Sequence, residues 1–266
     1  MIRDKNRREI VLRPVRPNVG ARAAYRKKLL ALIDAMQASY ERFLIAAYRN
    51  NEPEMAQDAL PSTELKRALA KLTKRWNKQF DQAAEDLAAY FAKSAASRSD
   101  AQLKSILRKG GFSVKFKMTH AMRDVMNATI AENVSLIKSV PAEFQTQIEG
   151  LVMRGVTAGR DLQVISEGLQ KQLGVAKRRA EFIARDQTNK MTASFTRVRQ
   201  IELGITEAIW LHSHGGRTPR VSHVKNSGHR YDVDKGWYDP TVKQYIWPGI
   251  LPNCRCVSRP IVKGFS

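Results

Sequence analysis

Apolar side chains recur at steps of three and four residues along most of the first two hundred positions of this chain. That spacing places them on one face of a helix, and such a face has to be buried against other helices. A chain of 266 residues is long enough to build a sizeable core in this way. The stripes predict a body of long amphipathic helices. Three of them include Tyr25, Leu29, Ile33, Met36 and Tyr40; Leu65, Leu69, Leu72, Trp76 and Phe80; and Ala180, Ile183, Met191, Phe195 and Ile201.

Proline, glycine and capping residues predict where these helices begin and end. Pro53 ends the first helix, and Ser62 or Thr63 begins the second. Ser99 then opens a shorter helix that Gly110 and Gly111 close. The remaining expected helices run from about Thr119 to Ser139, from Pro141 to a break at Gly155–Gly159, from an Asp161 cap to Gly174, and from Val175 to Leu203.

The chain changes character after Gly204. Segment 205–214 is rich in β-forming residues and is expected to be a strand. After a stretch of turn residues, segment 231–237 alternates apolar and charged residues until Gly236 breaks the run, and a final strand is expected after Cys256. We therefore predict an α+β fold, with a mostly helical N-terminal region followed by a small α+β C-terminal domain of short antiparallel strands. The expected parts are a basic flexible arm over residues 1–20, a helical region over 21–139 and a C-terminal domain over 140–266.

The chain is strongly basic. It has 46 lysines and arginines against 25 acidic residues, a net charge of +21, which attracts polyanions such as nucleic acid, an anionic membrane or an acidic protein. Because the charge is spread along the chain, we expect non-specific contact with phosphates rather than sequence readout. The candidate nucleic-acid-binding residues lie in the basic helix over 175–203: Arg178, Arg179, Arg185, Arg197 and Arg199.

Several classes of protein do not fit the sequence. No apolar run approaches the length of a membrane span, and the first residues lack the apolar core of a signal peptide, so we expect no membrane contact and a cytoplasmic chain unless an assembly carries it elsewhere. The chain has no GxxxxGK[ST] loop, which argues against an NTP-driven motor.

Rare, reactive side chains gather between Trp210 and Val262. Cys254 and Cys256 are two positions apart, so on a strand their thiols face the same side, with roughly 6.6 Å between α-carbons, at the edge of what a disulfide tolerates. A shared zinc ion is geometrically easier. The alternative is a pair of buried thiols beside hydrogen-bonded histidines. The candidate zinc ligands are Cys254, Cys256, His223 and His212, with His214 in place of His212 as an option.

Catalysis by the same residues is a separate hypothesis. In one version, either cysteine is a nucleophile that His223 activates. In another, the chain is a metal-dependent nuclease with His223 as its general base. No glutamate follows Glu207, so an ADP-ribosyltransferase with a late catalytic glutamate is unsupported. We predict no catalytic residue.

The order of motifs in this segment resembles the phage head morphogenesis domain, the minor head protein family named for protein F of phage Mu. The resemblance covers about residues 140–262. In one departure, the family usually has an acidic residue shortly before the first motif arginine, where this chain has His214-Gly215-Gly216. The residues that carry the resemblance are Trp210, Arg217, Arg220, His223, Gly228, Pro252, Asn253, Cys254, Arg255 and Cys256, after the basic helix segment 180–185.

The resemblance implies a minor capsid protein of a tailed bacteriophage, made in few copies, without established enzymatic activity. Its implied partners are the portal protein, major capsid or scaffolding proteins, and viral DNA, during procapsid assembly, packaging or ejection. Its implied location is the capsid interior or portal vertex, after assembly in the host cytoplasm. Arg217 and Arg220 also have a structural role open to them, holding turn carbonyls or Asp232 and Asp234. A metal-dependent nuclease or toxin-like effector using the His/Cys cluster is the alternative function.

Overall fold

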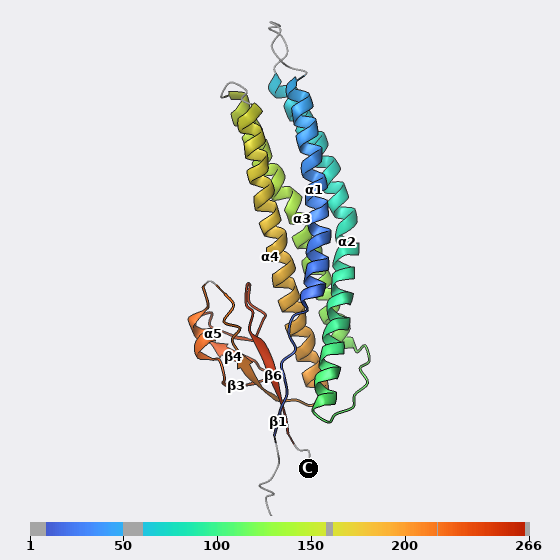
Figure 1. The fold of residues 1–266 in the computed structure, drawn as a ribbon, viewed down its shortest axis with the longest axis vertical. Coiled ribbons are helices and arrows are strands. Elements are labelled where there is room, and N and C mark those ends of the chain that lie inside the picture. Colours follow the sequence, from blue (N-terminus) through green and yellow to red (C-terminus); the bar gives the residue numbers. More distant parts are fainter. Residues whose placement is uncertain (1–8, 50–60, 158–161, 217, 264–266) are drawn as a thin grey trace, which may run out of the picture. The chain divides into compact units, whose positions relative to one another are not determined.

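The computed structural model describes residues 9–49, 61–157, 162–216 and 218–263. Long helices come first in these residues, and short strands and one short helix follow (Figure 1). The helices are α1 (Val19–Arg49), α2 (Pro61–Lys109), α3 (His120–Thr157), α4 (Leu162–Glu202) and α5 (Val221–Lys225). The strands are β1 (Ile10–Val11), β2 (Glu207–Leu211), β3 (Arg230–Asp232), β4 (Trp237–Asp239), β5 (Gln244–Ile246) and β6 (Val257–Val262). The predicted α+β fold is confirmed.

The chain divides into two compact units that do not follow the order of the sequence. The helical unit consists of Ala23–Ala89 and Ala131–Ala184. The strand unit consists of Met1–Arg22, Tyr90–Ile130 and Arg185–Ser266. Each of α1 to α4 contributes a segment to both units. The domain boundaries expected after residues 20 and 139 stay a prediction.

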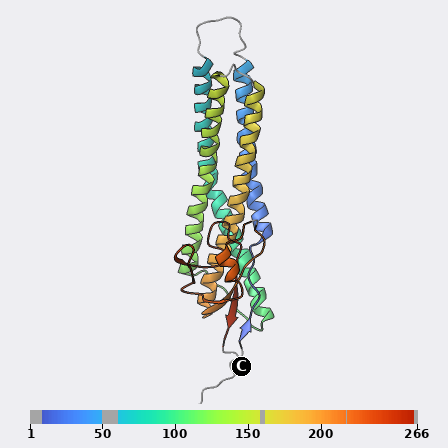
Figure 2. The ribbon, with the colours of Figure 1, turned by 90° about the vertical axis from the view of Figure 1, so that its left-hand side faces the viewer.

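The helical unit packs segments of α1, α2, α3 and α4 side by side (Figures 1 and 2). Their apolar stripes meet in a core whose side chains are almost fully buried, because each helix has only one apolar face to hide. The Tyr25 hydroxyl donates a hydrogen bond of 2.8 Å to Asn133 Oδ1 inside it. Core residues from the four helices include Tyr25, Ile33 and Met36; Leu72, Trp76 and Phe80; Ile137, Phe144 and Ile148; and Ile165, Leu169 and Ile183.

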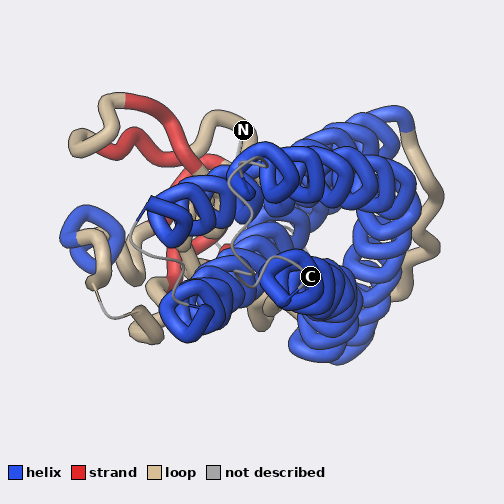
Figure 3. The backbone as a smooth tube through the Cα atoms, turned by 90° about the horizontal axis from the view of Figure 1, so that it is seen from above, coloured by secondary structure: helices blue, strands red, loops and turns tan. Residues whose placement is uncertain are grey.

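The strand unit is built on an antiparallel sheet of order β1-β6-β2-β3, beside a separate hairpin of β4 and β5. Figure 3 shows these strands as short red pieces joined by tan loops. Trp210, in β2, is completely buried and is the largest side chain of the core. The rest of this core is Leu12, Val15, Leu103, Leu107, Ile205, Ala208, Tyr231, Val233, Ile246, Cys254, Cys256 and Val262.

The described part of the expected flexible arm is held in the sheet. Ile10 and Val11 pair with Val262 and Ile261 of β6, and the Leu12 amide donates to the Pro260 carbonyl at 2.9 Å. The flexibility expected for residues 1–20 is therefore wrong for this part, because its few apolar side chains reach the core and offset the cost of ordering a basic segment. Residues 1–8 lie outside the described residues.

Three expected helix breaks do not occur, since Ser99, Pro141 and Gly174 lie inside α2, α3 and α4. Around Pro141 the buried stripe continues from Ile137 to Phe144. Packing of such a stripe offsets the roughly 3 kcal/mol that an interior proline costs a helix and the roughly 1 kcal/mol that a glycine costs.

Other expected helix ends fall at the edges of the described segments. Helix α3 continues through Gly155 as far as Thr157, so the first glycine of the expected break does not end it. The rest of that break, through Gly159, lies outside the described residues, as do the expected break at Pro53 and the Asp161 cap.

The last quarter also differs in detail from expectation. Residues 221–225 form α5, where no helix was expected. The run 231–237 divides between β3 and β4, and Gly236, where a break was expected, has a φ of 85° and lies between them. None of the described helices contains an apolar stretch long enough to cross a bilayer.

The turn at Gly236 generates a stability prediction with a matched control. Gly236 and Gly111 both have positive φ, 85° and 90°. A Cβ at Gly236 would lie 2.8 Å from the Ile246 carbonyl oxygen, whereas one at Gly111 would meet nothing within 4 Å. We expect Gly111→Ala to lower the free energy of unfolding by about 1–2 kcal/mol through φ strain alone, and Gly236→Ala to lower it by about 3 kcal/mol or more. Thermal and denaturant unfolding measure both. Equal losses would show that the hairpin accommodates the methyl group.

Candidate functional site

One histidine and two cysteines form a buried cluster in the strand unit. His223 comes from α5, and Cys254 and Cys256 come from the segment that leads into β6. His223 Nδ1 lies 3.4 Å from Cys254 Sγ and 3.6 Å from Cys256 Sγ. The three side chains are 2%, 3% and 4% exposed. Among the described residues this is the group of histidine, cysteine and acidic side chains with the geometry of a metal site, its ligand atoms within 4.8 Å of one another.

Helix α4 holds the cysteine segment in place. Asn253 has a positive φ of 60°, a conformation that asparagine tolerates better than most residues. Its amide donates a 2.6 Å hydrogen bond to Asp186 Oδ1, and the Asn189 side chain donates a 3.0 Å hydrogen bond to the Cys254 carbonyl. Arg185 reaches the same turn through a 3.1 Å hydrogen bond to Asn253 Oδ1. Polar groups of α4 thus fix the backbone that presents the two sulfurs.

The other side of His223 faces a buried carboxylate. His223 Nε2 lies 3.4 Å from Asp239 Oδ2, and Asp239 is fully buried. Asp239 accepts hydrogen bonds from the Thr241 amide at 2.8 Å and the Ser222 hydroxyl at 3.1 Å. Burial opposes ionisation of Asp239, but these hydrogen bonds, together with His223, outweigh it and lower the pKa of the carboxyl group. The imidazole therefore stands between two sulfurs and an ionised carboxylate.

The two sulfurs are not equivalent. The interaction between the two thiols is the largest influence on both, and it lowers the pKa of Cys254 while raising that of Cys256. Burial opposes ionisation of each, and His223 favours it at Cys254. The Gly249 amide donates to Cys254 Sγ at 3.4 Å.

Aromatic rings enclose the cluster. The Trp210 ring meets those of His223, Tyr231 and Trp237 edge-to-face, with centroids 5.0, 6.0 and 5.3 Å apart. The Trp210 indole nitrogen is buried without a hydrogen-bond acceptor among the described residues under ordinary geometric limits. These rings cover one side of the imidazole and lower the local dielectric constant, which strengthens its electrostatic interactions with the thiols.

The other motif residues surround the cluster. The Arg220 guanidinium donates to the Pro252 carbonyl at 2.9 Å, which is the turn-holding role open to it, and Arg255 donates to the Gly215 carbonyl. His212 accepts a 3.1 Å hydrogen bond at Nδ1 from the His214 amide, and burial lowers the pKa of its imidazole. His212 lines a small cavity of about 60 Å³ with His223, Cys254 and Cys256, but it lies outside the three-residue group. Arg217 lies outside the described residues.

Comparison with protein families agrees with the motif. Residues 146–259 match the family described as phage Mu protein F like protein. The resemblance drawn from the sequence is confirmed, and the matched residues run from the second half of α3 through β6 to Arg259.

A curated relative extends the similarity over nearly the whole chain. An uncharacterized protein of Haemophilus influenzae is 26% identical over 273 aligned residues, which cover 98% of this chain and 58% of the relative. The chain thus spans under two thirds of that relative's length. No solved structure matches this chain.

Four of the five candidate DNA-binding arginines make hydrogen bonds or ion pairs within the protein: Arg179, Arg185, Arg197 and Arg199. Arg199 is 2% exposed and bonds both Asp100 oxygens at 2.7 and 2.8 Å, Glu202 at 2.8 Å and the Lys117 carbonyl at 2.8 Å. Arg197 donates to the carbonyls of Val233 and Asp234 and lies 3.9 Å from the centroid of the Trp247 ring. The expectation of DNA contact is therefore wrong for Arg199, because its guanidinium is buried and paired.

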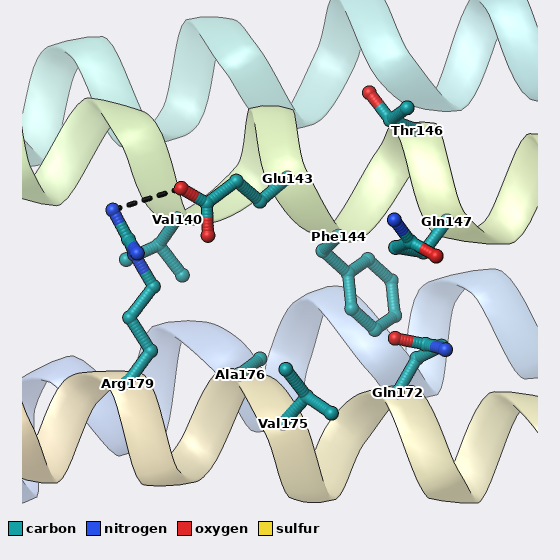
Figure 4. Close-up of a pocket in the computed structure, with 9 residues that line it drawn as sticks. All are labelled: Val140, Glu143, Phe144, Thr146, Gln147, Gln172, Val175, Ala176 and Arg179. Carbon is teal, nitrogen blue, oxygen red and sulfur yellow. Dashed lines mark ion pairs between the residues drawn. The ribbon is translucent and has the colours of Figure 1, made fainter.

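Arg178, Arg179 and Arg185 are all less buried than Arg199. Arg178 is exposed and Arg185 is half-buried against Asn253. Arg179 pairs with Glu143 at 2.9 Å at the edge of a pocket of about 520 Å³ in the helical unit (Figure 4). Figure 4 shows the Phe144 ring between the two helices of this pocket. Its other lining residues are Val140, Thr146, Gln147, Gln172, Val175 and Ala176, so most of its surface is apolar or amide.

Sequence reasoning missed three residues that the Mu F-like site depends on. Asp239 faces His223, and Asp186 and Asn189 hold the cysteine turn. For α4 a signal was present, since the four successive polar residues 186–189 interrupt an amphipathic helix and are all buried. Polar side chains in a buried stripe need partners. Asp239 had no comparable signal, because its role follows from where the β4–β5 hairpin lies against α5.

The buried arginine generates the second prediction. Burial lowers the pKa of Arg199, but its hydrogen bonds with Asp100 and Glu202 outweigh that and raise it, so the charge is retained. Arg199→Met leaves both carboxylates without their cation, and we expect the free energy of unfolding to fall by about 3 kcal/mol. Arg178→Met, at an exposed position of the same helix, is the control and is expected to change it by less than about 0.5 kcal/mol. Chemical denaturation compares the two, and a loss no larger for Arg199 than for Arg178 would contradict the structural role.

Proposed function

We propose that this chain is a minor head protein of a tailed bacteriophage, which associates with the portal vertex and with viral DNA during procapsid assembly, packaging or ejection. The observation that carries the proposal is the match of residues 146–259 to the phage Mu protein F like family. The motif residues that the structure describes gather around one buried cluster, as expected for a folding and assembly module. Location in the virion follows from the same proposal.

The geometry of His223 favours this function over the nuclease alternative. A general base has to reach the proton that it removes from a substrate or a water molecule. His223 is 2% exposed, its Nδ1 faces two sulfurs, and its Nε2 faces the buried Asp239. Both nitrogens are therefore directed at the protein's own groups, which suits a structural centre.

A row of basic residues on α2 is more accessible to a polyanion than Arg197 and Arg199 on α4. Between Lys66 and Lys78 the sequence KRALAKLTKRWNK carries six basic residues and no acidic one. All six are exposed, while Leu69, Leu72 and Trp76 are buried on the opposite face. We name these residues the α2 basic face: Lys66, Arg67, Lys71, Lys74, Arg75 and Lys78.

The spacing of the α2 basic face supports contact with a phosphate backbone. Positions 67, 71, 74, 75 and 78 recur at steps of three and four residues and so form a stripe along the helix. Exposed cations in a row, without base-reading geometry, bind polyanions through counterion release and without sequence preference. We therefore propose that this face, rather than Arg197 and Arg199, makes the DNA contact.

The head assignment is tested in particles. In the phage or prophage that encodes this chain, procapsids and mature heads are purified by density gradient, and quantitative mass spectrometry measures the chain relative to portal and major capsid protein. We expect it to co-purify at a few copies per portal ring. Particles purified from a strain lacking the coding sequence serve as the background. Absence of the chain from both procapsids and heads would refute the proposal.

The DNA contact is tested by salt dependence. We expect the quadruple variant Lys71→Gln, Lys74→Gln, Arg75→Gln and Lys78→Gln to weaken binding to duplex DNA by about tenfold or more near 0.1 M salt. It should also reduce the slope of log affinity against log salt by about 3 to 4, since each phosphate contact contributes about 0.9. Fluorescence anisotropy across a salt series measures both quantities.

A matched control removes the same charge from the same helix. Lys93, Lys104, Arg108 and Lys109 are also exposed on α2. Changing these four to glutamine alters the net charge equally but leaves the α2 basic face intact. An equal loss of affinity in both variants would mean that only total charge matters, and an unchanged affinity in the first would exclude this face.

A further inference from the structure

We propose that His223, Cys254 and Cys256 bind one zinc ion, and that Asp239 orients the histidine ligand. The inference rests on the geometry of the strand unit and does not depend on the proposed head function. Zinc suits the donor set, because it accepts both thiolate sulfur and neutral imidazole nitrogen in a tetrahedral arrangement.

The distances between the donor atoms fit a common metal ion. With Zn–S bonds of about 2.3 Å and Zn–N bonds of about 2.05 Å, two neighbouring ligands of a tetrahedral site have sulfur and nitrogen roughly 3.5 Å apart. The structure has His223 Nδ1 at 3.4 Å from one sulfur and 3.6 Å from the other. All three donor atoms lie within 4.8 Å of one another, so one ion between them contacts each without a large movement.

The surroundings of the histidine match those of a metal ligand. A histidine that binds a metal through one ring nitrogen usually directs the other N–H at a carboxylate, which fixes the tautomer and the ring orientation. Here Nδ1 faces the sulfurs. Nε2 lies 3.4 Å from Asp239 Oδ2, a contact outside ordinary hydrogen-bond geometry that a small rotation of the ring converts into a hydrogen bond. Asp239 is itself fully buried and held by Ser222 and Thr241.

The surroundings of the sulfurs match those of thiolates. The Gly249 amide donates to Cys254 Sγ at 3.4 Å. The Trp210 indole N–H is buried without an acceptor that meets ordinary hydrogen-bond geometry among the described residues. Two buried thiolates without a cation would repel each other, whereas N–H donors and a divalent cation stabilise both.

The fourth position of the ion faces the small cavity of about 60 Å³ that His212 and Arg220 also line. A water molecule completes the tetrahedron there. His212 lines the cavity but lies outside the group whose donor atoms are within 4.8 Å of one another. We therefore assign three protein ligands.

Metal content of the full-length chain tests the proposal. The protein is produced without a polyhistidine tag in zinc-supplemented medium and dialysed against metal-free buffer, and elemental analysis then measures zinc. We expect about one zinc per chain. Replacement by cobalt should give the visible absorption of a tetrahedral site and a sulfur-to-cobalt charge-transfer band. Zinc far below one per chain, together with no cobalt bands, would overturn the proposal in favour of buried, metal-free thiols.

Variants identify the ligands. Cys254→Ser, Cys256→Ser and His223→Ala are each expected to lose the bound zinc. His229→Ala, at an exposed histidine of the same unit, and His212→Ala are expected to keep it. Loss of zinc from His212→Ala, or its retention in His223→Ala, would overturn the three-residue ligand set. Circular dichroism confirms which variants fold.

Asp239 gives a test that does not remove a ligand. Asp239→Asn keeps the shape of the side chain but removes the charge that faces His223 Nε2. We expect it to retain one zinc at saturation and to weaken zinc affinity about 10- to 100-fold, measured by competition with a chelator of known affinity. An unchanged affinity would contradict the orienting role of Asp239.

Discussion

The contact of His223 with two cysteine sulfurs and a carboxylate is the interaction on which the strand unit depends. It joins three separate segments of the last quarter of the chain: α5, the end of β4 and the turn before β6. Trp210 covers this contact from β2, and Asp186 and Asn189 hold the cysteine turn from α4. The short strands have little surface of their own to bury. Their arrangement therefore relies on side chains that link elements rather than on the length of the ladders.

Side chains that link elements also include several basic residues of the strand unit. Arg197, Arg199 and Arg220 all donate to carbonyl groups, and Arg199 also binds two carboxylates. A guanidinium offers several donors in a fixed plane, so one arginine can satisfy several loop carbonyls at once. A high net charge in a short motif is therefore weak evidence for a nucleic-acid surface. Exposed lysines and arginines along a regular helix, as on the α2 basic face, are better evidence.

The sequence was informative where a periodic pattern met a simple physical rule. The stripes through Ile33, Phe80 and Ile183 predicted long helices, because an apolar face at helical spacing has to be buried. Helix breaks were less predictable, since Ser99, Pro141 and Gly174 are weak local signals that packing overrides. The three expected ligands Cys254, Cys256 and His223 do lie together, because the two-residue spacing and the family motif constrain them.

What the sequence could not predict depends on tertiary packing. Asp239 stands beside His223 only because the hairpin of β4 and β5 packs against α5, and no local pattern encodes that contact. The separation of His212 from the other ligands has the same origin, since a bond to the His214 amide orients its ring. Arg199 was expected at a DNA surface because basic helices are often exposed, but its burial beside Asp100 follows from contact between α2 and α4.

The central claim is that this cluster is a structural centre built on a metal ion. Diffraction from crystals of the full chain, measured on both sides of the zinc absorption edge, tests it most directly. The account predicts one anomalous peak per chain, present only above the edge and within bonding distance of His223 Nδ1, Cys254 Sγ and Cys256 Sγ. No peak at this position, with the imidazole and the thiols in simple hydrogen-bond contact, would contradict it.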